Sequence, residues 1–105
     1  MYQKILLDFL AIESDKNIEG IDFQVVKDVE NNHYQLVESG WYAKRFIYAV
    51  LFHFQIKENG RIWILVNNTD VLVAEALVRK GIEPSDIVLS YVPEKARQYT
   101  GFAVA

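Results

Sequence analysis

Apolar side chains at the start of the chain recur at the spacing of an α-helix. Tyr2, Ile5, Leu6, Phe9 and Leu10 fall on one side of such a helix, and the pattern stops at the loop composition SDKN. A stripe of this width is typical of a helix that packs on a sheet, and the alternative is a face that binds a partner.

From residue 22 the period changes to two, which predicts strands. The alternation favours strands over residues 22–30, 33–39, 45–57 and 61–67. Asn31 and Asn32 predict a turn because asparagine tolerates left-handed backbone conformations. The stretch SGWYAK is expected to connect the second and third strands, with Gly40 as its flexible point.

The third strand is the longest and the most aromatic. One parity is strongly apolar, and the other is apolar only in its middle. We therefore expect a central strand whose aromatic face lies under the helices, with these members: Phe46, Tyr48, Val50, Phe52, Phe54 and Ile56.

Asn59-Gly60 stands between two strands and predicts a type I′ hairpin. A two-residue turn fixes the register and places Ile56 opposite Trp63. The same register pairs Phe54 with Leu65 and His53 with Val66, so Trp63 is expected in the core.

The second half of the chain predicts a helix, a short strand and a shorter helix. Thr69 is expected to cap a helix with Val73, Ala74, Leu77 and Val78 on its buried side, and Gly81 to end it. IVLSY predicts a strand, and Pro93 suits the first position of the last helix. The fold class is α+β: one domain, residues 1–105, with an antiparallel four-stranded meander and helices on one face.

Composition narrows the classes of function. The 105 residues carry a net charge of -3 and contain no cysteine. Thiol nucleophiles, disulfides and thiolate metal sites are therefore excluded, in keeping with a cytoplasmic protein. The N-terminal segment lacks the features of a signal peptide, and no apolar run is long enough to span a membrane. An acidic domain is an unusual unaided binder of DNA.

Chemistry-bearing residues are few. His33 and His53 form a candidate polar site. We expect ordinary hydrogen bonding there, and the alternative is a metal-binding or acid–base role. The sequence has no phosphate-binding loop, nucleophile elbow or metal-ligand spacing. We assign no catalytic, cofactor-binding or metal-binding residues. An enzyme that uses His53 with a carboxylate is the least favoured class.

Four residues are candidates for a partner interface. Trp41 is the more exposed of the two tryptophans in our interpretation, and Arg45 belongs to one of three basic groups, with Lys44. Arg97 precedes an apolar ending and is able to bind a carboxylate or nearby carbonyls. The other basic groups are Arg79-Lys80 and Lys95 with Arg97; their convergence on one face would favour direct DNA binding instead.

The apolar ending GFAVA raises a separate question. Phe102 and Val104 are expected to pack against the domain, held by Arg97 or a neighbouring strand, and contact with another subunit or a partner is the alternative. An exposed sheet edge also predicts a homodimer.

Four stretches together resemble the XisI family, the fdxN element excision controlling factor proteins. They are HYQLVESGW, GRIWI, GIEPSDIVLSY and YTGFAVA, and the resemblance runs over nearly the whole chain. The positions that match the family pattern are His33, Tyr34, Gly40, Trp41, Arg45, His53, Trp63, Gly81, Pro93, Arg97, Thr100 and Phe102.

The resemblance implies a compact α+β fold and a role in programmed DNA excision during heterocyst differentiation in nitrogen-fixing filamentous bacteria. It implies a non-enzymatic accessory protein that binds an XisH-like partner, which itself resembles restriction-type nucleases. It supplies no catalytic residues and no cofactor. The chain departs from the family pattern at Gln55, where an aspartate is usual, at Ser90, and in the stretch after IWI.

Overall fold

The computed structural model describes residues 2–105. It contains a helix, α1 (Tyr2–Ser14), and a sheet of five strands in sequence order: β1 (Ile21–Asp28), β2 (His33–Tyr42), β3 (Arg45–Ile56), β4 (Ile62–Asn67) and β5 (Ile87–Leu89). The first four strands are antiparallel, and β5 pairs with β4 in parallel. The predicted α+β class is confirmed. The sheet has one more strand than expected because the segment after α2 (Val73–Arg79) returns to the β4 edge.

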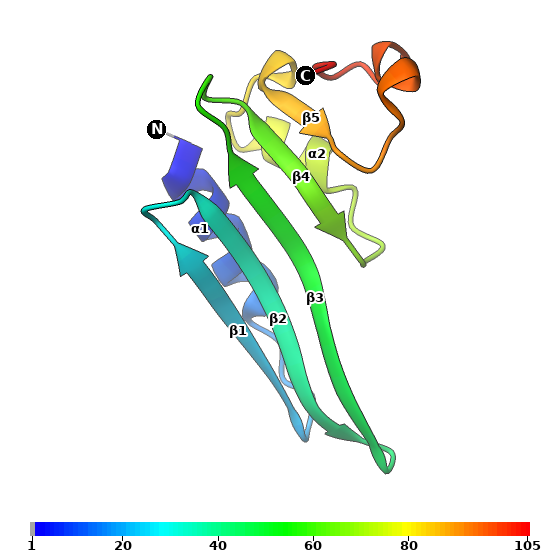
Figure 1. Ribbon diagram of the computed structural model, residues 1–105. Helices are drawn as coiled ribbons and strands as arrows, with labels where there is room; N and C mark the ends of the chain where they lie inside the picture. Colours follow the sequence, from blue (N-terminus) through cyan, green and yellow to red (C-terminus); the bar gives the residue numbers. More distant parts are fainter. Residues whose placement is uncertain (1) are drawn as a thin grey trace.

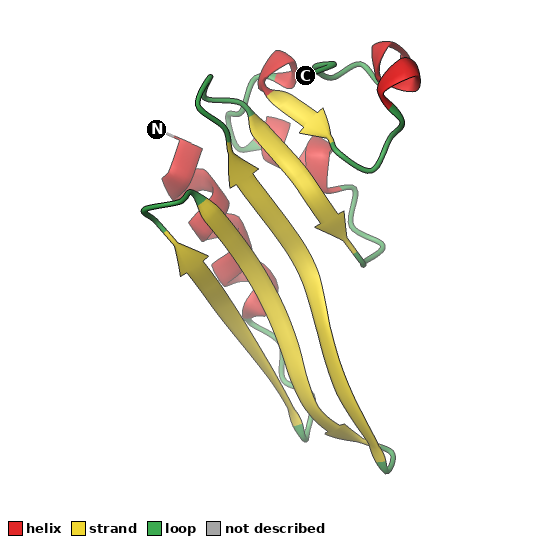
Figure 2. Ribbon diagram, in the orientation of Figure 1, coloured by secondary structure: helices red, strands yellow, loops and turns green. Residues whose placement is uncertain are grey.

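Both helices lie on the same face of the sheet (Figures 1 and 2). Phe9 of α1 packs edge-on against Phe52, with ring centroids 5.2 Å apart, and also contacts Phe54. Burial of these rings and their neighbours supplies the main favourable term in folding. The fully buried side chains around them include Leu6, Leu10, Tyr34, Leu36, Ile62, Ile64 and Leu77. The opposite, open face of the sheet carries no helix (Figure 1).

A β-bulge divides the aromatic side chains of β3 between the two faces. Leu36 pairs with Phe52 and Val37 with Val50, so Leu51 is an extra residue on β3. Phe52 and Phe54 are buried, whereas Phe46 and Tyr48 are 59% and 67% exposed. The prediction of one continuous aromatic face under the helices is therefore wrong for the half of the strand before the bulge.

The hairpin between β3 and β4 differs from the predicted type I′ turn. The Lys57 N–H donates to the Arg61 carbonyl at 2.9 Å, which encloses three residues rather than two. Gly60 has a positive φ of 83° and Asn59 does not, the pattern of a type I turn followed by a left-handed residue. The register shifts by one, so Trp63 pairs with Gln55 and Phe54 with Ile64.

The shift has two consequences for the predicted pairs. A second bulge, between His53 and Phe54, restores the predicted pairing of His53 with Val66. Trp63 itself points to the open face, because its neighbours Ile62 and Ile64 are the buried residues of β4. The prediction that Trp63 belongs to the core is wrong.

The two-residue turn with positive φ at both positions occurs instead between β2 and β3. The stretch SGWYAK is not a long connection: β2 continues to Tyr42, and Ala43 and Lys44 alone form the turn, with φ of 49° and 66°. Figure 1 shows the resulting hairpin reaching beyond the helices. Its tip is consequently the most isolated part of the described chain.

The second helix begins later and ends where predicted. Thr69 does not cap it: its Oγ1 accepts a hydrogen bond from the Val71 N–H, and the helix starts at Val73. At the other end, Gly81 has a φ of 112°, and Ile82 donates to the Leu77 carbonyl in a Schellman arrangement. Pro93 precedes a 3₁₀ helix, η2 (Glu94–Tyr99), rather than an α-helix.

The C-terminal tail packs on its own domain. The Ala103 N–H donates to the Ile87 carbonyl at 2.8 Å and forms a parallel bridge beside β5. Phe102 packs against the core cluster. Arg97 donates to the carbonyls of Val92, at 3.0 Å, and Val104, at 3.3 Å, so it ties the tail to the preceding loop. No helix within residues 2–105 combines the length and apolar character needed to cross a bilayer.

Deletion of residues 102–105 is expected to lower the free energy of unfolding. The lost burial of Phe102 and the lost tail hydrogen bonds outweigh the entropy regained by the tail, which leaves about 1–2 kcal/mol. Thermal unfolding should show a fall in Tm of roughly 5–10 °C. Tyr99→Ala, at a side chain 82% exposed, is the control and should leave Tm unchanged. An unchanged Tm in the truncated chain would contradict a structural role of the tail.

The Ala43–Lys44 turn gives a second prediction. Non-glycine residues at positive φ carry strain, so Ala43→Asn with Lys44→Gly is expected to stabilise the fold by about 1 kcal/mol. Urea unfolding of the double variant measures this. Glu58→Gly, in the other hairpin and at a position without positive φ, should not stabilise. A loss of stability in the double variant would show that the turn is unstrained.

Candidate interaction surface

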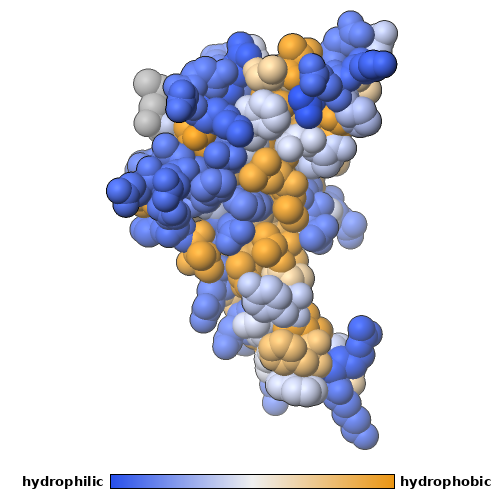
Figure 3. Space-filling view, in the orientation of Figure 1, coloured by the Kyte–Doolittle hydropathy of each residue, from blue (hydrophilic) through white to orange (hydrophobic). Residues whose placement is uncertain are grey.

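An apolar stripe runs along the open face of the sheet, over β2 and β3. Alternation along the strands and the pairing of Val37 with Val50 and of Ser39 with Tyr48 place the stripe on this face. Figure 3 looks onto the same face and shows apolar surface running from the middle of the molecule to the hairpin tip. We call the following residues the open-face stripe: Val37, Trp41, Phe46, Tyr48 and Val50. A contiguous apolar surface of this kind is typical of a protein-interaction site.

Trp41 lies at the outer end of the stripe, as the sequence predicted for the more exposed tryptophan. Its ring is 63% exposed and contacts Phe46 at a centroid distance of 5.5 Å. The backbone N–H of Trp41 donates to the Gly20 carbonyl, so this residue also adjoins the segment before β1. Arg45 follows at the hairpin tip and is exposed. Their role as partner contacts stays a prediction.

The other two predicted interface residues serve the fold. The Arg97 guanidinium binds backbone carbonyls and lies 5.2 Å from the centroid of the Trp63 ring. Phe102 is part of the tail packing described above. Neither side chain is therefore presented outward in the way that Trp41 is, and their role in a partner interface remains untested.

The structure brings the two histidines together on the open face. His33 Nδ1 and His53 Nε2 are 2.9 Å apart, and the Gln35 amide lies 3.1 Å from His53 Nδ1. They come from neighbouring strands, because Gln35 pairs with His53 and His33 with Gln55. One shared proton is enough to bridge the two rings, so hydrogen bonding accounts for the arrangement. Residue 55, where the chain departs from the family pattern, is thus the strand partner of His33.

Burial lowers the pKa of His53 below its ordinary value, and the neighbouring charge of His33 lowers it further. A charged imidazole is disfavoured in a partly desolvated position, and two charged rings at this distance would repel each other. His53 is therefore neutral near neutral pH.

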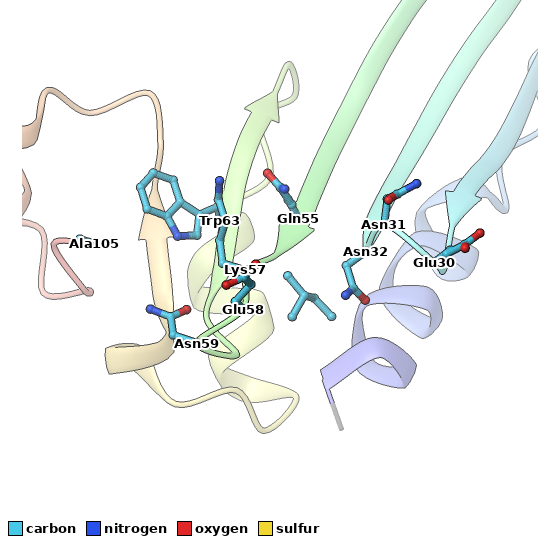
Figure 4. A pocket seen from close by; sticks show the side chains of 10 residues that line it. Glu30, Asn31, Asn32, Gln55, Lys57, Glu58, Asn59, Trp63 and Ala105 are labelled. Atoms are coloured by element: carbon cyan, nitrogen blue, oxygen red, sulfur yellow. The ribbon is translucent and has the colours of Figure 1, made fainter.

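A hollow of about 760 Å³ occupies the end of the sheet away from the hairpin tip. Figure 4 shows the side chains that surround it. Trp63 forms one wall and has the Lys57 ammonium 5.0 Å from its ring centroid. Glu30 and Glu58 provide carboxylates at the rim. This mixed polar lining suits a protein side chain or loop more than a deeply enclosed small molecule.

The net negative charge of the chain is concentrated on one edge. Residues 13–30 hold six acidic and two basic side chains, a net of -4, whereas the rest of the chain sums to +1. This segment runs from the end of α1 through the edge strand β1 and is exposed over most of its length. We call it the acidic edge. Its carboxylates favour a basic partner.

The basic groups do not gather into a matching surface. Lys44 and Arg45 lie at the hairpin tip, whereas Arg79 and Lys80 end α2 near the other end of the sheet (Figure 1). Arg97 is engaged with the tail. Within residues 2–105, no group of three histidine, aspartate or glutamate side chains is placed to hold a metal ion.

Sequence reasoning missed two parts of this surface. The alternation along residues 45–57 predicts Phe46 and Tyr48 in the core, since nothing in the local pattern indicates the bulge at Leu51. Gln35 was not singled out, although it shares the parity of His33 on β2 and so was bound to lie on the same face. The acidic edge was missed as well, although the surplus of six acidic over two basic side chains in residues 13–30 can be counted in the sequence.

The profile of the XisI protein family matches residues 1–104. The crystal structure of a XisI-like protein from Anabaena variabilis ATCC 29413 superposes with a TM-score of 0.82 at 38% identity, covering 97% of this chain and 91% of that one. The fdxN element excision controlling factor XisI from the same organism has the same fold, with a TM-score of 0.74 at 24% identity and coverages of 98% and 91%. Curated protein sequences give no match.

The depressed pKa of His53 predicts a loss of stability in mild acid. In the unfolded chain the imidazole titrates at about 6.5, above its value in the folded state, so protons bind the unfolded chain more readily. Stability should therefore fall as the pH drops through about 6.5. The difference between the urea unfolding midpoints at about pH 7 and about pH 5 should be smaller in His53→Gln than in the native chain. Equal pH dependence of the two proteins would contradict the assignment.

Proposed function

Because the chain belongs to the XisI family, we propose that it is a non-enzymatic factor that controls excision of a DNA element by binding a partner protein. The name of the structural relative, an excision controlling factor, supports the excision role. The observation that carries the binding mechanism is the acidic edge. Residues 13–30 have a net charge of -4, whereas the whole chain has a net charge of -3.

The proposed partner is an XisH-like nuclease, and the two proteins are proposed to bind each other in the cytoplasm. Nucleases that grip the DNA backbone present basic surfaces. An acidic edge with complementary charge accelerates encounter with such a surface and competes with DNA for it. Binding of the edge to the nuclease would thereby couple the amount of this protein to the amount of nuclease that is able to reach DNA.

The described side chains support an accessory role over a catalytic one. The single histidine cluster is satisfied by internal hydrogen bonds, and its partner Gln35 is an amide rather than a carboxylate. A general acid–base pair needs two titrating groups that face a substrate. Direct DNA binding is the weaker alternative, because the basic groups lie at separate ends of the molecule.

Charge reversal on the acidic edge tests the proposal. Asp15→Lys, Glu19→Lys and Asp22→Lys together change three exposed side chains without removing a hydrogen bond of the fold. The dissociation constant for a purified XisH-like partner is expected to rise at least about tenfold. The affinity of the native chain should also fall as salt is raised, because the interaction is largely electrostatic.

The matched control reverses the same number of charges elsewhere. Glu75, Glu83 and Glu94 are exposed and lie outside the acidic edge. Their change to lysine should leave partner binding within about threefold of the native value. Light scattering on mixtures of the two native proteins provides the decisive reading: the absence of a mixed complex at about 50 μM would rule the partner out.

A further inference from the structure

The two ends of the open face have complementary shapes. The hairpin tip projects at one end of the sheet, and the hollow beside Trp63 lies at the other (Figures 1 and 4). Apolar surface runs along β2 and β3 from the middle of the sheet to the hairpin tip (Figure 3), and the histidine pair lies between this surface and the hollow. One face thus holds, in order, a projection, an apolar half, a polar group and a recess.

The spacing of these features is symmetric about the middle of β3. The strand runs from Arg45 to Ile56, so its midpoint falls between Val50 and Leu51. Val50 and its strand partner Val37 form the inner end of the open-face stripe, at the middle of the open face. A two-fold axis across the strands at this point would bring the hairpin tip of one copy over the hollow of another, and the reverse.

Charge follows the same symmetry. Lys44 and Arg45 make the tip basic, while Glu30 and Glu58 stand at the rim of the hollow. Lys57 also lines the hollow, but its ammonium lies over the Trp63 ring. An antiparallel pair of copies would therefore place the guanidinium of Arg45 near carboxylates at both ends of the interface.

We infer that a second copy of this chain covers the open face, with the strands of the two sheets antiparallel and the hairpin tip of each copy in the hollow of the other. The pairing is isologous, so every contact occurs twice. Apart from Glu30, which also belongs to the acidic edge, it uses residues distinct from that edge, and it does not depend on the proposed function. The charges of β1 oppose pairing of two copies through that edge, which leaves the face as the surface for self-association.

The arrangement also accounts for the polar group beside the stripe. Tyr48 and His53 lie at equal distances along β3 from the midpoint, on opposite sides of it. The two-fold axis therefore brings the phenol of Tyr48 from one copy over the histidine pair of the other. A hydroxyl that both donates and accepts suits that position.

Multi-angle light scattering after gel filtration tests the inference with the chain alone. At about 50 μM the native protein should have twice the 12.2 kDa mass of one chain. Phe46→Glu and Tyr48→Glu change exposed side chains, so each variant should keep the circular dichroism spectrum of the folded chain and run as a monomer. Tyr99→Glu, at an exposed aromatic outside the stripe, should remain a dimer. A native monomer, or variants that remain dimeric, would overturn the inference.

A charge exchange tests the antiparallel arrangement. Arg45→Glu should raise the dissociation constant of the dimer at least about tenfold, and adding Glu58→Arg in the same chain should restore most of the loss. Failure of the second change to restore association would overturn the tip-in-hollow contact. Binding of the XisH-like partner is measured separately, so a negative result there leaves this test intact.

Discussion

The helix that covers the sheet is about half as long as the longest strand. Thirteen residues of α1 extend about 20 Å, whereas the twelve residues of β3 extend about 40 Å. A helical layer of that length buries Phe52 and Phe54 and leaves the far half of β2 and β3 without cover on either face. The projecting hairpin, its exposed aromatic rings and the separation of the two ends of the molecule all follow from this mismatch.

The bulge at Leu51 marks where the covered half of the sheet gives way to the uncovered half. Before it, the aromatic side chains of β3 face the open side; after it, they face α1. One inserted residue thus lets a single strand serve a core at one end and a surface at the other. A regular strand of the same composition would bury all six apolar positions on one side and expose an alternating polar face.

The sequence predicted the parts of this fold that depend on local chemistry. The period of α1, the Asn31–Asn32 turn, the Gly81 cap and the exposed position of Trp41 follow from spacing and from individual side chains. The errors share another origin. They all depend on β-bulges and on loop length, which tertiary packing selects and which the local sequence does not reveal. This holds for the turn at 58–60, the exposure of Trp63 and the faces of Phe46 and Tyr48. The meeting of His33 with His53 required the register of β2 and β3, which the local pattern did not determine.

The two edges of the sheet are closed by different means. Charged side chains surround β1, and the tail residue Ala103 occupies the outer side of β5 through its bridge to Val88. A sheet with both edges blocked does not extend sideways from one molecule to the next. The tail held by Arg97 therefore does more than bury Phe102, because it also protects the β5 edge from aggregation. A chain that loses the tail exposes the short apolar strand Ile87–Leu89. The unpaired backbone groups of this strand are then free to pair with other molecules in solution.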